Sequence, residues 1–351
     1  MSKKIKTGIL GATGLVGQYL ISLLEEHPWF EVTELAASEK SVGKTFGETC
    51  IWRISRPMPE SVKRMTMKSA SPADNFSADV VFSSMPSDVA GKIEIQFALT
   101  GYPVISNSSS HRMDDDVPLI IPEVNPDHSA LIPIQKRNRK WNGFIITNPN
   151  CTTIGLTLAL TPLKKQFGVE LVQVTSYQAL SGAGSAGVVS LDIIDNVIPF
   201  IKNEELKVES EPLKLLGMVQ NDKIELAPFR VSAHCSRVNV SHGHLLAVSV
   251  KLKRKPSVDE FISAFSSFIS PIQSLNLPSA PLKPIIIKGE TDRPQPKFDR
   301  NTDNGMAISI GRIRPCPVFD YKFFTVSHNM IRGAAGASIL NAELLKAQGY
   351  L

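Results

Sequence analysis

The stretch GILGATGLVG, residues 8–17, lies where an apolar segment gives way to residues with helical apolar spacing. The segment KIKTGILGA predicts a short buried strand, and LVGQYLISLLEEH predicts a helix. Glycines between them permit a tight turn, close approach of the backbone to a pyrophosphate, and close helix–strand packing. The motif therefore predicts a dinucleotide-binding turn, more by its position than by its GxxGxxG spacing. The residues that we expect to contact the cofactor here are Gly11, Thr13, Gly14, Leu15, Val16 and Gly17.

The same alternation of strands and helices continues through the first 150 residues. FEVTELAAS, ADVVFSSMP and YPVISNSS predict further strands, each ending in small polar residues. Strands separated by helices indicate a parallel sheet, in which ligands bind beyond the carboxyl ends of the strands. The sequence thus predicts an α/β protein with a Rossmann-like dinucleotide-binding domain.

The pattern changes between residues 151 and 325. A long apolar helix follows Cys151, and VELVQVTSYQAL, HLLAVSVKLK and NGMAISIGRI predict strands, with a helical stretch near 188–217. This order predicts an α+β domain with a mostly antiparallel sheet. The tail predicts an amphipathic helix that returns to the first domain, so we expect residues 1–150 and 326–351 to form one domain and 151–325 the other.

Composition narrows the class of protein. The net charge of +5 is spread along the chain, and its densest basic cluster, QKRNRKW at 135–141, predicts a solvated loop rather than a nucleic-acid site. The four cysteines are far apart and form no CxxC pair, which argues against a disulfide framework and against a metal site. Neither a signal peptide nor an apolar run of about 18 residues is evident. We therefore expect a cytoplasmic protein that binds neither membrane nor nucleic acid.

The end of the second strand indicates which dinucleotide is bound. NAD sites usually place an acidic residue there, but this chain has Ser38 at that position, followed by Lys40 and Ser41. Hydroxyl and ammonium groups suit a 2′-phosphate, so the sequence predicts NADP(H). Glu39 leaves NAD open as the alternative.

Cys151 stands between a predicted strand and a predicted helix, in NPNCTT at 148–153. The positive end of a helix favours the thiolate, which is the nucleophilic form. A nucleophilic thiol beside a hydride carrier indicates chemistry at the aldehyde and acyl oxidation levels, through a covalent thioester.

A base for this chemistry is offered by CSRVNVSHGHLLAV. It contains His242 and His244, and Arg237 precedes His244 by an odd number of residues. An unbroken strand would place Arg237 and His244 on opposite faces, whereas a turn at Ser-His-Gly would bring both into one site.

Several motifs occur together in one order: SNSSSHRM, IPEVN, NPNCTT, SYQALSGAG, EELKVESEPLKLLG, SRVNVSHGH and HNMIRGAAG. In these motifs the chain resembles the aspartate-semialdehyde dehydrogenase family, from GILGATGLVG to the C-terminal helix, and its archaeal and fungal branch in particular. The resemblance implies that Cys151 is the nucleophile, that Gln178 orients the substrate, that His244 is the acid/base and that Arg237 binds the α-carboxylate. Family members often have Asp or Glu in place of His242, which could alter the pKa of His244 or act as the base itself.

The resemblance also implies how the substrate and the nicotinamide are held. Glu204, or alternatively its neighbour Glu205, would contact the substrate amino group. The phosphate ligands would be Lys207 and Arg112, with Asn107. The residues lining the nicotinamide side would be Ser181, Gly182 and Asn329.

The implied reaction is NADP-dependent reductive dephosphorylation of L-4-aspartyl phosphate to L-aspartate 4-semialdehyde, a step in aspartate-family amino-acid biosynthesis. The second domain would be both catalytic and a dimerisation domain, giving a homodimer or homotetramer. A related acyl reductase, acting on malonyl-CoA or on N-acetyl-glutamyl phosphate, is the nearest alternative, and Glu204 argues against both. A catalytically silent NADP-binding regulator is a more remote one, since all the expected catalytic residues are present.

Overall fold

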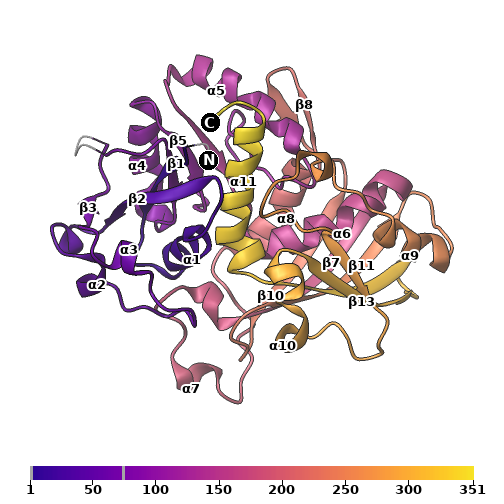
Figure 1. Cartoon of the computed structure of the whole chain (residues 1–351). Coiled ribbons are helices and arrows are strands. Elements are labelled where there is room, and N and C mark those ends of the chain that lie inside the picture. The colour runs from indigo at the N-terminus through magenta and orange to yellow at the C-terminus, as the bar shows by residue number, and fades with distance from the viewer. Residues whose placement is uncertain (1–2, 73–75) are drawn as a thin grey trace.

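The computed structural model describes residues 3–72 and 76–351, which contain two six-stranded sheets. The helix α11 (Gly336–Ala347) lies between these sheets in the view of Figure 1. The first sheet has six parallel strands in the order β3-β2-β1-β4-β5-β6. Their bounds are Ile5–Leu10 (β1), Phe30–Ala37 (β2), Lys68–Ser69 (β3), Val80–Ser83 (β4), Pro103–Ser106 (β5) and Phe144–Thr147 (β6).

Alternating apolar side chains place helices on both faces of this sheet. Ile9 of β1 and Phe82 of β4 face a core shared with α1 (Leu15–Leu24), whereas Leu10 and Val81 face one shared with α4 (Ser87–Leu99). Both faces are therefore covered, as a parallel sheet requires. The remaining helices of this half are α2 (Phe46–Thr49), α3 (Glu60–Lys63) and α5 (Leu131–Arg139), with 3₁₀ turns at Glu39–Ser41 and Pro126–Ala130.

The prediction of a loop at QKRNRKW was wrong. Its first five residues form the end of α5, which stops where Lys140 adopts a left-handed backbone conformation with φ of 56°. Basic side chains suit the C-terminal end of a helix, because they lie beside its unpaired carbonyl groups. A cluster of charges thus marked a helix terminus and not a loop.

The second sheet has the order β10-β7-β11-β14-β13-β12. The three central pairings are antiparallel, and the two outermost strands pair in parallel, so the sheet is mixed with an antiparallel centre. The strands are Val169–Gln178 (β7), Arg230–Arg237 (β10), His244–Leu252 (β11), Ile285–Lys288 (β12), Ile308–Pro315 (β13) and Tyr321–Ser327 (β14), with a separate hairpin of Met218–Gln220 (β8) and Lys223–Glu225 (β9).

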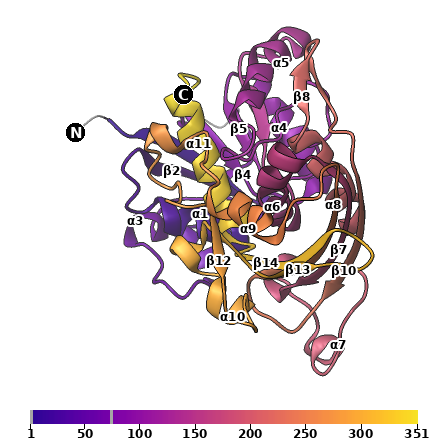
Figure 2. The same cartoon turned by 90° about the vertical axis from the view of Figure 1, so that its right-hand side faces the viewer.

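Within the described residues, helices cover one face of the second sheet and leave the other face open. The helices α6 (Cys151–Phe167), α8 (Glu204–Leu215) and α9 (Val258–Ser266) share one core with the sheet's inward side chains. The short helices α7 (Ser190–Ile193) and α10 (Pro296–Asp299) lie at its end, and α7 projects away from the rest of the molecule (Figure 2). On the uncovered face, Gln173 and His234 are exposed and Tyr177 is half-buried.

The C-terminal segment returns to the first sheet. A π-helical turn at Ile331–Ala335 (η6) leads into α11 (Gly336–Ala347). Ile339, Ala342 and Leu345 of α11 pack in the same core as α1. In the described residues, no helix combines the length and the apolar character needed to cross a membrane.

Candidate active site

A cavity of about 880 Å³ opens at the carboxyl edge of the first sheet, beside the start of α6. Among the residues expected at the site, those lining it are Gly11, Thr13, Gly14, Leu15, Val16, Ser38, Asn107, Arg112, Cys151, Ser181, Gly182, Lys207 and Asn329. Seven of the expected residues fall outside the lining formed by the described residues. Those that lie behind Cys151 are Gln178, Glu204, Arg237 and His244, and the others are Gly17, Lys40 and Ser41.

The glycine turn provides a place for an anion. Gly11 has a φ of +76°, and a Cβ there would lie 2.9 Å from the carbonyl oxygen of Ser84. Gly14 is the N-cap of α1 and brings no side chain to the amides of the first turn, which remain open to a pyrophosphate. Gly17 serves packing instead, since a Cβ there would lie 2.5 Å from the carbonyl oxygen of Gly11. These residues fit a dinucleotide.

At the end of the cavity expected to hold the ribose, the lining formed by the described residues includes the acidic Glu39 and not the predicted Lys40. Ser38 and Glu39 both line this end. The Glu39 carboxylate accepts a hydrogen bond of 3.1 Å from the Ser69 hydroxyl, which ties it to the end of β3. The acidic side chain therefore lies nearer this end of the cavity than the neighbouring lysine does.

Cys151 begins α6, and Asn150 caps that helix. The Asn150 side-chain oxygen accepts hydrogen bonds from the amides of Thr152 (2.8 Å) and Thr153 (3.2 Å), while its side-chain nitrogen donates to Glu204 (2.8 Å). Asn is among the best N-cap residues because its oxygen satisfies amides that have no partner in the helix. The cap fixes the first turn and hence the direction of the thiol.

One edge of the second sheet supplies the side chains behind Cys151. Gln178 ends β7, Arg237 ends β10, and His244 begins β11. Because β10 runs parallel to β7 and β11 antiparallel to it, the ends of the first two strands and the start of the third meet at one edge. A Cβ on Gly182 would lie 2.7 Å from Arg237 Nη1 and 3.3 Å from His244 Cε1, so both side chains reach the same space.

His244 contacts the nucleophile directly. Its Nε2 lies 3.1 Å from Cys151 Sγ, and its Nδ1 accepts a 3.1 Å hydrogen bond from the Ala179 amide. Since Nδ1 accepts, the neutral ring carries its proton on Nε2, the nitrogen that faces the sulfur. Burial lowers the pKa of His244 to about 3; Glu204 opposes this shift, and Arg237 adds to it.

The burial of the thiol opposes the effect expected from the helix start alone. Burial raises the pKa of Cys151 to about 12, and Glu204 adds to the increase. Arg112, Arg237 and Lys207 act in the opposite direction. Desolvation therefore outweighs the helix N-terminus, and the cysteine and histidine face each other as a neutral pair.

His242 lies elsewhere. Its ring stacks on His328 at 5.3 Å and meets the edge of Tyr19 at 6.1 Å, at the contact between the two domains. Burial lowers the pKa of His242, and Arg300 adds to the effect. The geometry thus gives the contact with Cys151 to His244 alone of the two.

Glu204, the first residue of α8, lies under the site. Its Oε1 accepts hydrogen bonds from Asn150 (2.8 Å) and Gln178 (3.0 Å), and its Oε2 lies 3.5 Å from Lys207 Nζ. Burial alone would raise its pKa, but Lys207 and these hydrogen bonds outweigh it and lower the pKa. The alternative, Glu205, turns away and accepts from the Cys235 amide.

The chain matches two family models, the semialdehyde dehydrogenase NAD binding domain over residues 6–132 and the semialdehyde dehydrogenase dimerisation domain over residues 160–332. An aspartate-semialdehyde dehydrogenase from Archaeoglobus fulgidus is 54% identical over 97% of the chain and 98% of the relative. The chain belongs to the aspartate-semialdehyde dehydrogenase family. A Schizosaccharomyces pombe member is 43% identical over 99% of both chains. The crystal structure of aspartate-semialdehyde dehydrogenase with NADP from Candida albicans matches with a TM-score of 0.93 and 39% identity, covering 99% of this chain and 100% of that one.

In this member of the aspartate-semialdehyde dehydrogenase family, the tail completes the cavity. Asn329 accepts from the Gly243 amide (2.9 Å) and donates to the Ser181 hydroxyl (2.8 Å), so it joins two loops beside the cysteine. A Cβ on Gly333 would lie 2.6 Å from the Cys151 Cβ, which shows how closely the π-helical turn passes the nucleophile.

Sequence reasoning missed two residues at the site, the cap Asn150 and the buried Glu211. The spacing of charges on α8 could have revealed the second, because Glu204, Lys207, Glu211 and Lys214 recur at three- and four-residue steps and so share one face. No cluster of metal-ligating side chains occurs within residues 3–72 and 76–351.

Proposed function

We propose that the protein catalyses the NADP-dependent reductive dephosphorylation of L-4-aspartyl phosphate to L-aspartate 4-semialdehyde. The observation that carries this proposal is the 3.1 Å contact between Cys151 Sγ and His244 Nε2 at the inner end of a dinucleotide-sized cavity. Family membership supplies the substrate, and the cations around the thiol suit its phosphate and carboxylate.

In the proposed reaction, the Cys151 sulfur attacks the acyl carbon, the carbon–oxygen bond to phosphate breaks, and the departing phosphate takes up the thiol proton. NADPH, when bound, supplies hydride to the thioester carbon. The carbon–sulfur bond then breaks, which releases the aldehyde and a Cys151 thiolate, and the thiolate takes up a proton from solvent to restore the thiol. Throughout, His244 Nε2–H donates a hydrogen bond to whichever of the sulfur or the carbonyl oxygen carries negative charge.

Each charged group of the substrate would be held by side chains of the opposite charge. Arg237 would bind the α-carboxylate, because a planar guanidinium matches a carboxylate at two points. Glu204 would accept from the amino group, and Gln178, bonded to Glu204, would orient the acyl group. Lys207 and Arg112 would bind the phosphate, and both line the cavity.

The cofactor proposal is NADP(H), bound by residues 1–150 together with 326–351, with residues 151–325 as the catalytic and dimerisation domain. Support comes from the glycine turn and from the NADP in the similar Candida albicans structure. Because Glu39 lies at the ribose end, we expect Glu39→Gln to lower the KM for NADP and raise that for NAD, in a steady-state comparison of the two.

A homodimer is also part of the proposal. The matched dimerisation domain contains the uncovered face of the second sheet, and the α7 segment projects from it with several apolar side chains exposed. They are Val189, Leu191, Ile194, Val197 and Phe200. A second copy of the chain would cover this apolar surface. We further propose a cytoplasmic location, because all four cysteines, each in a described residue range, are free thiols.

The experiment that tests the function is reduction of NADP by L-aspartate semialdehyde in the presence and absence of inorganic phosphate. Phosphate-dependent NADPH formation by the wild type, lost in folded Cys151→Ala, would establish both the reaction and the nucleophile. Absence of turnover by folded wild type would refute the proposed substrate, and malonyl-CoA and N-acetyl-glutamyl phosphate would then be the substrates to test. Equal rates in both proteins would refute the role of Cys151.

A further inference from the structure

The buried carboxylate of Glu211 contacts both Arg112 and the start of the Cys151 helix. The residue is 1% exposed on α8, and its Oε1 accepts a 2.9 Å hydrogen bond from Arg112 Nη1. Its Oε2 accepts a 2.6 Å hydrogen bond from the backbone amide of Asn150, the cap of the Cys151 helix. Arg112 and Asn150 both line the cavity, whereas Glu211 lies behind them.

Arg112 retains donors for a ligand. A guanidinium has five N–H groups. One on Nη1 is directed to Glu211, and one on Nη2 to the backbone oxygen of Asn107 at 2.8 Å. Within the described part of the chain, the buried Nε has no hydrogen-bond partner. Two of the five donors thus fix the plane of the group, and the second N–H of Nη1 and that of Nη2 remain for phosphate oxygens.

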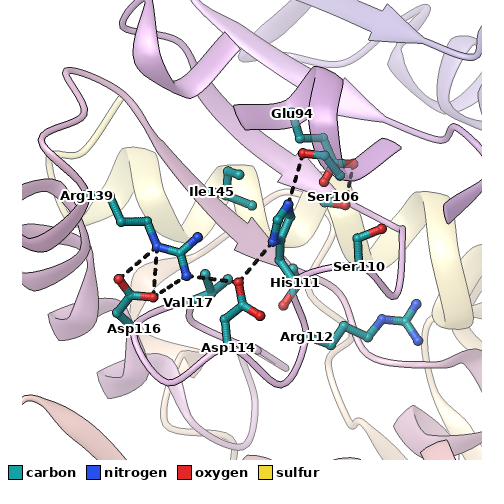
Figure 3. A network of polar contacts seen from close by, with 12 residues as sticks. Glu94, Ser106, Ser110, His111, Arg112, Asp114, Asp116, Val117, Arg139 and Ile145 are labelled. Carbon is teal, nitrogen blue, oxygen red and sulfur yellow. Dashed lines mark hydrogen bonds and ion pairs between the residues drawn. The ribbon is translucent and has the colours of Figure 1, made fainter. Parts of the chain in front are cut away.

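Hydrogen bonds from other elements hold the backbone of the loop that bears Arg112. Lys214 Nζ donates to the backbone oxygens of Arg112, Asp114 and Val117 at 2.7, 2.6 and 2.8 Å. On the other side His111 contacts Asp114, and Arg139 binds the same carboxylate, while Arg112 extends away from both (Figure 3). Because the backbone is held, the orientation of the Arg112 side chain depends on its two partners, the Asn107 carbonyl oxygen and the Glu211 carboxylate, and Glu211 is the one that belongs to a side chain.

We propose that Glu211 is a positioning residue. It fixes the orientation of the Arg112 guanidinium relative to Cys151, so that the guanidinium can bind phosphate. This inference rests on the proposed function. A carboxylate also neutralises part of the Arg112 charge, and its removal would by itself strengthen phosphate attraction. Orientation outweighs this effect, because two-point binding of phosphate requires the plane of the guanidinium to be fixed, whereas Lys207 supplies undirected charge in either case.

Glu211→Gln tests the inference with little change in shape. The amide offers one oxygen to two donors, and its NH₂ group must face either Arg112 or the Asn150 amide. We expect the KM for phosphate to rise about tenfold, with the KM for NADP within twofold of wild type. The matched control is Glu209→Gln, on the same helix, where the carboxylate accepts from the Ala233 amide at 3.0 Å outside the cavity; it should leave both constants unchanged.

A double-mutant cycle separates positioning from a general structural role. If Glu211 acts through Arg112, then Glu211→Gln in an Arg112→Lys background should change the KM for phosphate less than twofold. Full additivity, or a wild-type KM for phosphate in folded Glu211→Gln, would overturn the inference.

If Glu211→Gln does not fold, Glu211→Asp provides the second variant. Its carboxylate is one methylene too short to reach both donors, so a raised KM for phosphate is expected and an unchanged one would overturn the inference. Wild type without phosphate-dependent NADP reduction would refute the proposed function and this inference with it. If the wild type is active and substitution of Glu211 leaves the KM for phosphate unchanged, the inference alone is refuted.

Discussion

Replacing Asn150 by alanine removes the side-chain hydrogen bonds that hold the start of α6. The side-chain oxygen accepts from the amides of Thr152 and Thr153, and the side-chain nitrogen donates to buried Glu204. Loss of an N-cap costs about 1 kcal/mol, and loss of a hydrogen bond to a buried charge about 1.5–3 kcal/mol. We therefore expect Asn150→Ala to lower the free energy of unfolding by about 2.5–4 kcal/mol, or Tm by roughly 3–5 °C.

Asn150→Asp is the informative partner, because it keeps the cap but places a second carboxylate against Glu204, where the present contact is 2.8 Å. Like charges at this distance raise the pKa of one group. An acid whose folded pKa is raised destabilises the protein as pH rises above its unfolded pKa. The Tm deficit of Asn150→Asp should therefore grow from pH 5 to pH 8, while that of Asn150→Ala stays constant.

Thermal denaturation followed by circular dichroism at both pH values measures these effects, with wild type at each pH as the reference. A Tm of Asn150→Ala within about 1 °C of wild type would refute the energetic role assigned to the cap. A pH-independent deficit in Asn150→Asp would refute its placement against Glu204.

Three further predictions concern other parts of the molecule. Arg237→Lys, which loses two-point carboxylate binding worth about 1.5–3 kcal/mol, should lower kcat/KM for aspartate semialdehyde about 10- to 150-fold and leave the KM for phosphate unchanged, in steady-state assays. Burial alone would lower the pKa of His111, but Asp114 and a backbone carbonyl outweigh it and raise the pKa, so His111→Gln should cost more stability at pH 6 than at pH 9 in urea unfolding. Leu191→Glu with Phe200→Glu should shift the protein from dimer to monomer in analytical ultracentrifugation, and an unchanged dimer would contradict the role of α7.

The sequence predicted those features that depend on local pattern. GILGATGLVG located the dinucleotide turn, because glycines at a strand–helix junction leave few other structures available. The odd separation of Arg237 and His244 indicated a turn between them, and the structure has β10 ending at the first and β11 beginning at the second.

Features that depend on long-range burial could not be predicted in this way. The pKa of Cys151 is raised by desolvation from elements far along the chain, which no local motif reports. Glu211 contacts Arg112 across a sequence separation of 99 residues, so its partner is visible only once α8 is docked on the loop. The sequence shows which side chains share a helix face, but not what that face meets.

The return of the tail to the first sheet has a consequence for synthesis of the protein. Ile339, Ala342 and Leu345 belong to the core that packs against α1, although some three hundred residues of chain separate them. During translation the apolar surface of this face of the N-terminal domain stays exposed until α11 has left the ribosome. A chain that stops before α11 would thus damage the first domain to be made rather than the last.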